Sequence, residues 1–192
     1  MRNLDQILKH NREFVEGKKY EQYLTDKFPD RKMVIVTCMD TRLTELLHRA
    51  MNIGNGDAKI IKNAGGIITQ PFGNIMRSVL VAIYELQAYE VFIIGHHGCG
   101  MSGLDPERVV GNMIKRGVSE DTIATLQHSG IDMMRWLAGI QDVRKSVENS
   151  VSIVRNHPLL PPGIPVHGLV IHPETGELEL VTSGYGEEAG QQ

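Results

Sequence analysis

The sequence predicts an α/β fold, with a mostly parallel central sheet flanked by helices and an antiparallel edge strand supplied by a C-terminal hairpin. Short apolar runs rich in β-branched residues recur along the chain, as is typical of strands buried in a parallel sheet. Segments with helical spacing of apolar residues separate these runs and so give βαβ units. Near the C-terminus, two apolar runs flank Pro173-Glu174-Thr175-Gly176, which is a hairpin signal.

The composition is that of an ordinary soluble protein with one domain. The chain has 192 residues, 41% hydrophobic and 22% charged, which predicts a single domain over residues 1–192. No apolar run approaches the roughly 20 residues of a membrane helix, and the N-terminus lacks the apolar core of a secretory signal. We therefore expect a cytoplasmic protein with reduced cysteines and no membrane contact. A net charge of −3 gives no general attraction to nucleic acid and favours a small neutral or anionic partner.

Residues 1–30 are predicted to form a helical arm. Within residues 2–16, apolar side chains at helical spacing would give a helix with a one-sided apolar face, formed by Leu4, Ile7, Leu8 and Phe14. A second short helix is predicted over residues 20–28, before Pro29-Asp30-Arg31 turns the chain. The arm packs either on its own domain or on another subunit, and the sequence leaves both alternatives open.

Three strands and two helices follow, and each strand is an apolar run bordered by turn residues. The strands are predicted over residues 33–38, 58–62 and 90–95, and the helices over residues 43–51 and 72–87. Apolar residues on several faces of the longer helix indicate that it is largely buried against the sheet.

The second half of the chain completes the sheet. The elements predicted there are helices over residues 105–116 and 142–157, short helical pieces over 119–140, strands over 166–171 and 178–182, and a flexible tail over 184–192. Pro106 suits the first turn of its helix, whereas Pro158 ends the later one. Met133, Met134 and Trp136 indicate core or interface packing rather than a cofactor site.

Reactive side chains follow two of the predicted strands. Cys38, Asp40 and Arg42 stand at alternate positions where the first strand ends, and His96 and Cys99 follow the third strand. Because open α/β sheets gather such groups at the carboxyl ends of their strands, we expect these side chains to meet. Two thiolates and one imidazole suit zinc, and three protein ligands leave the fourth position open, as in catalytic sites. Cysteines are more often packing residues, but an acid and a base beside a thiol are costly to bury without a purpose or a mutual pairing.

These residues bear a specific resemblance to a known family. Cys38-Met39-Asp40-Thr41-Arg42, together with Gly95-His96-His97-Gly98-Cys99-Gly100, resembles the β-class carbonic anhydrases. Ile61-Lys62-Asn63-Ala64-Gly65-Gly66 and Val166-His167-Gly168-Leu169-Val170-Ile171 look like two further segments of that family, so the likeness covers nearly the whole chain. Within the family the chain is similar to the archaeal-type subclass, which also occurs in bacteria. Thr41 stands where most members have serine and keeps the hydroxyl.

The resemblance implies a zinc lyase, carbonate dehydratase, which hydrates carbon dioxide reversibly to bicarbonate and a proton. Zn²⁺ would be held by Cys38, His96 and Cys99, and a zinc-bound hydroxide would attack carbon dioxide. Asp40 would orient the hydroxide while Arg42 holds Asp40, and in a closed form of the site Asp40 itself would take the fourth zinc position. Family members form homodimers or higher homo-oligomers, in which an N-terminal arm clasps the partner subunit.

The loop residues Ala64, Gly65 and Gly66 have two interpretations. They form either a backbone wall beside the substrate or a tight strand exit that requires positive φ. His97 neighbours a predicted ligand and could move protons. A position on the opposite face of an extended segment favours a supporting or surface role instead. The histidines outside this segment are expected to be surface or hydrogen-bonded structural residues, namely His48, His128, His157, His167 and His172.

Three alternatives remain beside hydration of carbon dioxide. Relatives of the archaeal-type subclass hydrolyse carbonyl sulfide or carbon disulfide on the same scaffold. A zinc-binding or thiol-based sensor without catalysis would keep the ligands and have no use for Asp40. A disulfide between Cys38 and Cys99 would abolish metal binding, but it is disfavoured in a reducing compartment.

Overall fold

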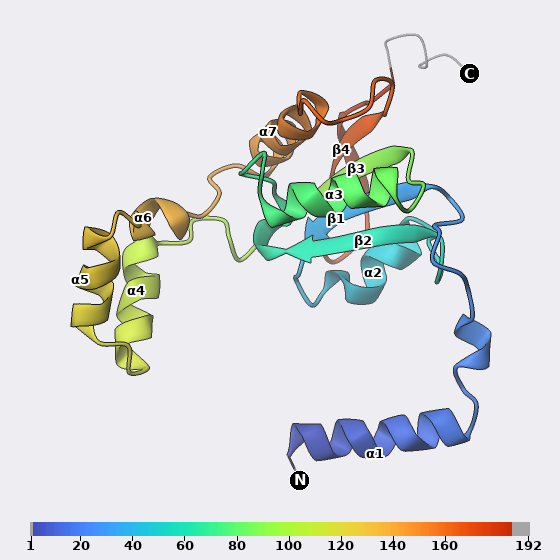
Figure 1. Cartoon of the computed structure of the whole chain (residues 1–192), viewed down its shortest axis with the longest axis horizontal. Helices are drawn as coiled ribbons and strands as arrows, with labels where there is room; N and C mark the ends of the chain where they lie inside the picture. Colours follow the sequence, from blue (N-terminus) through green and yellow to red (C-terminus); the bar gives the residue numbers. More distant parts are fainter. Residues whose placement is uncertain (1, 186–192) are drawn as a thin grey trace.

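The centre of the molecule is a five-stranded sheet in the order β2-β1-β3-β4-β5 (Figure 1). The computed structural model describes residues 2–185. The strands are β1 Met33–Cys38, β2 Ala58–Asn63, β3 Glu90–His96, β4 Val166–Ile171 and β5 Leu178–Thr182. Strands β2, β1, β3 and β4 run parallel, and β5 pairs antiparallel with β4. The predicted α/β fold with an antiparallel edge strand is therefore confirmed.

Helices cover both faces of the sheet and enclose two apolar cores. The helices are α2 Leu43–Ala50, α3 Asn74–Tyr84 and α7 Val143–Arg155. Side chains of α3 and α7 pack on one face, where Val36 and Ile93 belong to the same buried cluster. Leu43 and Leu47 of α2 belong to the second cluster, with Ile35 from β1. Because neighbouring residues of a strand point to opposite faces, β1 contributes to both cores and reads as a continuous apolar run.

Two glycines allow α7 to lie directly on the sheet. A Cβ atom at Gly95 would lie 2.8 Å from Val147 Cγ2, and one at Gly168 would lie 2.7 Å from Val147 Cγ1. Both distances are too short for real side chains, so only glycine permits this approach. Val147 is fully buried as a result, which stabilises the fold by about 1.5–3 kcal/mol. The contact fixes the helix against the strand that ends in His96.

Two helical segments project from this central unit (Figure 1). The N-terminal arm consists of α1 Asn3–Glu16 and the 3₁₀ turn η1 Glu21–Tyr23. The excursion between β3 and α7 consists of α4 Pro106–Lys115, α5 Glu120–His128 and α6 Met133–Trp136. Neither α1 nor α4 has a buried residue. Among the described residues, no helix has the length and apolar character needed to cross a membrane.

Several local features differ from the sequence-based expectations. The helix predicted over residues 20–28 is only the short turn η1, because Leu24 is extended and residues before Pro29 are biased away from helix. Trp136, expected to pack in a core or interface, is 68% exposed within this chain. In the predicted tail 184–192, Gly184 N donates to His167 Nδ1 and Tyr185 bonds Glu90, while residues 186–192 lie outside the described part.

Candidate metal centre and active site

Three potential metal ligands meet at the carboxyl edge of the sheet. Cys38 is the last residue of β1, His96 is the last residue of β3, and Cys99 lies in the turn that follows. Their ligand atoms all lie within 4.8 Å of one another, and all three residues are buried. β1 and β3 are adjacent and parallel, so their ends bring the cysteine and the histidine to the same place. The structure thus brings the side chains at the ends of these two strands close together, as the sequence led us to expect.

The spacing of the two sulfurs suits a shared tetrahedral metal ion. Cys38 Sγ and Cys99 Sγ lie 3.8 Å apart, and both cysteines are free. Two sulfurs that are each about 2.3 Å from zinc, at the tetrahedral angle, would be about 3.8 Å apart. A disulfide would need a sulfur–sulfur distance of about 2.05 Å. The observed spacing therefore fits zinc ligation better than oxidation.

His96 presents an unprotonated nitrogen to the two thiols. Its Nδ1 lies 2.9 Å from the carbonyl oxygen of His97, and because a carbonyl only accepts hydrogen bonds, Nδ1 carries the proton. Its Nε2 is buried without a hydrogen-bond partner among the described residues. Burial lowers the pKa of His96, which favours the neutral form that ligates metals. The orphaned Nε2 and the donor set together fit Zn²⁺.

The environment of Cys99 favours the thiol in the absence of a cation. Burial raises the pKa of Cys99, with an opposing hydrogen bond from the backbone N–H of Met101, 3.5 Å from Sγ. A metal ion must therefore displace a proton from this sulfur when it binds. Metal affinity should fall as the pH falls, because protons and metal compete for the same atom.

Asp40 and Arg42 form a tight ion pair beside the ligands. Arg42 Nε donates to Asp40 Oδ1 at 3.0 Å and Arg42 Nη2 donates to Oδ2 at 2.8 Å. The backbone N–H of Arg42 also donates to Oδ1, at 2.9 Å. These bonds, first the one from the Arg42 side chain, hold the pKa of Asp40 well below its usual range. The carboxylate is therefore ionised, and its Oδ2 lies 3.7 Å from His96 Nε2.

Backbone contacts hold the ion pair in place. Met39 N, just after β1, donates to the carbonyl of Asn63 at the end of β2, and Leu43 N donates to the carbonyl of Asp40 where α2 begins. Arg42 Nη2 donates to the carbonyl of Gly98 at 2.9 Å. The guanidinium thus links the carboxylate after β1 to the turn that contains Cys99. Movement of one strand end would disturb the other.

The loop after β2 lies against Cys38. Gly65 and Gly66 have φ values of +86° and +64°, the positive φ that one interpretation of this loop requires. A Cβ at Gly66 would lie 2.7 Å from the backbone nitrogen of Cys38. Asn63 Nδ2 donates to the carbonyl of Ile67 at 2.7 Å and so closes the loop. Ala64, which precedes these two buried glycines, is exposed.

The other histidines lie outside the ligand cluster. His97 is exposed, and its ring centre lies 6.0 Å from that of His172. His157 bonds the carbonyl of Pro71, and His167 bonds Glu90, each at 2.9 Å. His157 and His167 are therefore buried, hydrogen-bonded residues, as expected.

Two residues near the ligands were not singled out by the sequence. Thr37 Oγ1 donates to the carbonyl of Ile94 at 3.1 Å, and so ties β1 to β3 just before their ligands. Met101 donates its backbone N–H to Cys99 Sγ, as described above. A polar residue inside an apolar run could have pointed to Thr37. No sequence signal distinguishes Met101, because its position depends on contacts with distant segments.

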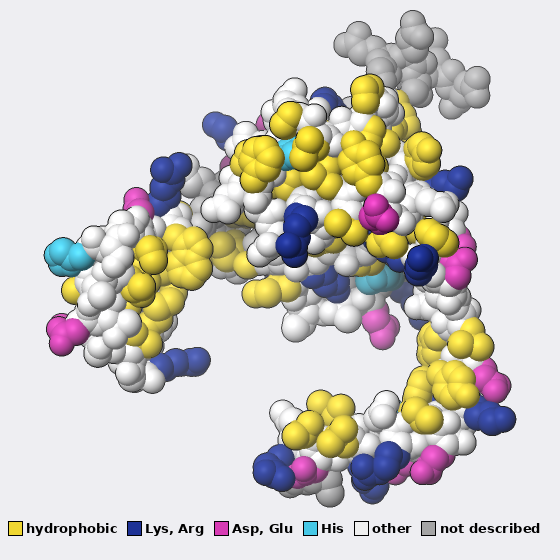
Figure 2. Space-filling view, viewed as in Figure 1, with side chains coloured by type: hydrophobic (Ala, Val, Ile, Leu, Met, Phe, Trp, Pro, Cys, Tyr) yellow, Lys and Arg dark blue, Asp and Glu magenta, His cyan; other side chains and the backbone are white. Residues whose placement is uncertain are grey.

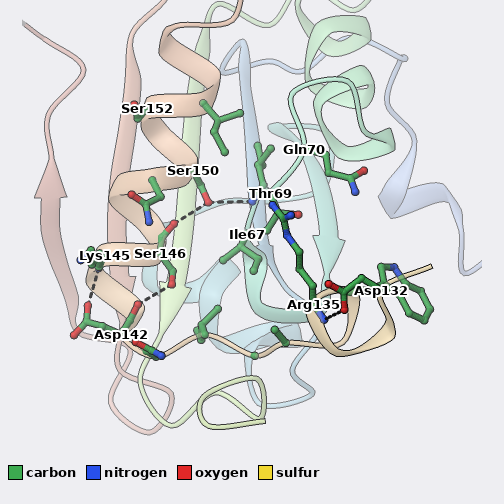
Figure 3. Close-up of a pocket in the computed structure, with 18 residues that line it drawn as sticks. Ile67, Thr69, Gln70, Asp132, Arg135, Asp142, Lys145, Ser146, Ser150 and Ser152 are labelled. Carbon is green, nitrogen blue, oxygen red and sulfur yellow. Dashed lines mark hydrogen bonds between the residues drawn. The ribbon is translucent and has the colours of Figure 1, made fainter. Parts of the chain in front are cut away.

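A large cleft lies beside the candidate metal centre. It has a volume of ≈ 980 Å³ and is lined by residues 67–70, by α6 and the segment that follows it, and by α7 as far as Ile153 (Figure 3). Figure 3 shows Arg135 extending from α6 toward Thr69. Ser150 Oγ accepts from Ile68 N at 3.0 Å and donates to the carbonyl of Ser146 at 2.8 Å. None of the three metal-ligand candidates lines this cleft.

Fold and site define a class of protein, an α/β protein with a cluster of potential metal ligands at the carboxyl edge of a parallel sheet. A family model described as carbonic anhydrase matches residues 33–178. The chain belongs to the β-carbonic anhydrase family. The resemblance noted from the sequence is thereby confirmed at the level of the family, and the archaeal-type subclass stays a prediction.

Several known proteins are similar to the chain over most of its length. "Putative carbonic anhydrase YvdA" of Bacillus subtilis is 58% identical over 185 residues, which cover 96% of this chain and 94% of that protein. A crystal structure of β-carbonic anhydrase isoform I from Trichomonas vaginalis matches with a TM-score of 0.86 and 36% identity, covering 96% of this chain and 100% of that one. A carbon disulfide hydrolase of Acidithiobacillus thiooxidans is 29% identical over 157 residues, 78% of this chain and 76% of that protein.

Proposed function

We propose that this protein is a zinc-dependent carbonic anhydrase, which converts carbon dioxide and water reversibly to bicarbonate and a proton. The observation that supports this proposal most directly is the buried cluster of two thiols and an unprotonated imidazole nitrogen, with an ionised carboxylate 3.7 Å from that nitrogen. Membership of the β-carbonic anhydrase family supports the same reaction.

Each residue of the site has a proposed role. Cys38, His96 and Cys99 would hold the metal. Bound zinc supplies Lewis acidity that lowers the pKa of a water molecule toward about 7. The carboxylate of Asp40 accepts a hydrogen bond from the reacting water and directs its lone pair toward the substrate. Arg42 holds both oxygens of Asp40 and so prevents the carboxylate from rotating. Gly65 and Gly66 would form the substrate-side wall.

The ion pair corresponds to the arrangement in which Asp40 is not itself a ligand. Arg42 occupies both carboxylate oxygens, so a closed form with Asp40 on the metal would require the guanidinium to release it. The low pKa of Asp40 keeps the carboxylate charged through the physiological range. Protonation of Asp40 is therefore not needed for such a closure, and the exchange of partners is the step that would control it.

The proposed reaction predicts zinc-dependent hydration that increases with pH. Two thiolates give the metal more electron density than three imidazoles would, so the reactive form of water should predominate only at higher pH. Stopped-flow hydration of carbon dioxide, on protein of known zinc content, should be faster at about pH 9 than at about pH 7. Fully metallated protein that is inert at both pH values would rule out the anhydrase.

Hydrolysis of carbonyl sulfide or carbon disulfide is the second candidate. It is favoured by one observation, the 29% identity to a carbon disulfide hydrolase. Such an enzyme would release hydrogen sulfide and turn over carbon dioxide weakly. The same metallated protein should be assayed for sulfide release, and rapid release with slow hydration would reverse the order of the two candidates.

We further propose that the protein is at least a homodimer, joined through the N-terminal arm. Leu4 and Ile7 of α1 are 62% and 64% exposed. α1 lies away from the sheet of its own chain (Figure 1), and hydrophobic side chains are exposed along the arm (Figure 2). Isolated helices shorter than about 12–15 residues are marginally stable in water, and α1 has 14 residues. An apolar face that the described part of the chain leaves uncovered is best stabilised by a second subunit.

Substitution in the arm should change the mass of the protein in solution. Ile7→Glu would place a charge on the apolar face of α1 and is expected to convert dimer to monomer. Lys9→Glu changes an exposed polar residue of the same helix and provides the matched control. Light scattering coupled to gel filtration measures both masses. A dimer that survives Ile7→Glu unchanged would mean that α1 does not form the interface.

A further inference from the structure

Met101 lies directly beside the proposed metal site. It follows the ligand Cys99 by two residues, and its backbone N–H points at the Cys99 sulfur from 3.5 Å. Its side chain is half-buried and packs against the apolar cluster that includes Cys38 and Cys99. On the other side it meets the loop after β2, because a Cβ at Gly65 would lie 3.3 Å from Met101 Cγ. Met101 therefore lies between the proposed zinc ligand Cys99 and the loop after β2, in contact with both.

The backbone of Met101 is fixed from the opposite direction as well. Its carbonyl accepts the backbone N–H of Ile140 at 2.9 Å, and Gly103 N donates to the carbonyl of Ile140 at 3.1 Å. Ile140 is buried, and Gly139 approaches the Met101 carbonyl so closely that a Cβ there would overlap it. Two segments joined only through the α4–α6 excursion thus hold Met101 in place. A side chain on such a backbone can act as a fixed boundary.

A fixed apolar side chain beside a reactive site can select substrates by their size. Carbon dioxide, carbonyl sulfide and carbon disulfide are linear, apolar molecules that differ mainly in length and width, since sulfur is larger than oxygen and forms longer bonds to carbon. All three could react with the same nucleophile, so the metal site alone gives little discrimination. An apolar wall beside the ligands, facing the glycine loop, gives discrimination by shape.

We propose that Met101 is a specificity-determining residue, whose side chain narrows the space between Cys99 and Gly65 and so favours carbon dioxide over its sulfur analogues. This inference rests on the proposed function, because it concerns access to the same site. Shortening the side chain opens space for sulfur without removing a ligand, Asp40 or Arg42.

The first test compares Met101→Ala with the volume-conserving Met101→Leu. In metallated protein, the ratio of kcat/KM for carbonyl sulfide to that for carbon dioxide should rise by at least about tenfold in Met101→Ala, because a single methylene group in an apolar pocket changes discrimination by about 10- to 200-fold. Met101→Leu should stay within about twofold of wild type. If Met101→Ala fails to fold or to retain zinc, Met101→Val removes less volume and replaces it. An unchanged ratio in the folded, metallated variant would overturn the proposal.

A second readout does not depend on turnover. Cyanate and thiocyanate are linear anions that differ by oxygen against sulfur, and cobalt in place of zinc reports their binding in its visible spectrum. Met101→Ala should tighten thiocyanate by about tenfold relative to cyanate. Parallel changes in both dissociation constants would contradict a size-selecting role. If wild-type protein hydrates no carbon dioxide, the proposed function fails, while this titration still decides whether Met101 limits the site.

Discussion

Replacement of Cys99 by serine is expected to remove zinc from the protein and to abolish zinc-dependent hydration of carbon dioxide. Among the described residues the cluster consists of Cys38, His96 and Cys99, so losing one thiolate leaves two of its three donors for the metal. A serine hydroxyl is a harder and less acidic donor that zinc prefers less than thiolate. Changes outside the ligand set already cost 10–100-fold in affinity, so loss of a ligand should cost at least about 100-fold.

The measurement is zinc content after dialysis, followed by stopped-flow hydration. Ser102→Ala provides the matched control, because Ser102 is exposed and lies in the same turn, three residues beyond the ligand. The control should retain about one zinc per chain and the wild-type rate. Zinc retained by Cys99→Ser at wild-type affinity would mean that the metal is held elsewhere, and the proposed ligand set would be wrong.

Three of the five strands could be predicted to the residue, and the other two were each one residue too short. β1, β4 and β5 begin and end at the predicted residues, because a run of β-branched residues bordered by polar turns defines both ends of a strand. Helix ends were less exact. α3 begins at Asn74 rather than residue 72, after Pro71 and Gly73 have directed the chain away from helix. Local signals thus define where an element lies better than where it ends.

The meeting of the ligands could also be anticipated, since parallel strands end at the same edge of a sheet. The protonation state of each side chain, in contrast, could not be predicted from the sequence. The proton on His96 Nδ1 depends on the carbonyl of His97, and the low pKa of Asp40 depends on three hydrogen bonds from Arg42. Met101 is the clearest case, because its position depends on Ile140, which approaches only after the whole α4–α6 excursion.

Asp40→Asn is expected to retain zinc and to lose most of its activity. Asparagine has nearly the same shape, but its amide is neutral and no longer forms the charged pair with Arg42. It also offers one acceptor oxygen in place of two. Loss of a positioned acceptor for the reacting water should lower kcat by about 100- to 10,000-fold. Asp30→Asn, a change of the same type at an exposed turn, provides the control and should leave the rate unaltered.

The pH profile of Asp40→Asn separates positioning from titration. Because the pKa of Asp40 in the wild-type protein lies well below its usual range, this carboxylate does not change charge between about pH 7 and about pH 9. The rise of activity over that interval must then come from another group, so Asp40→Asn should still show a rise with pH while its plateau falls. A variant whose residual activity no longer depends on pH over this interval would make Asp40 the titrating group. Full activity in metallated Asp40→Asn would instead mean that Asp40 has no role in the reaction.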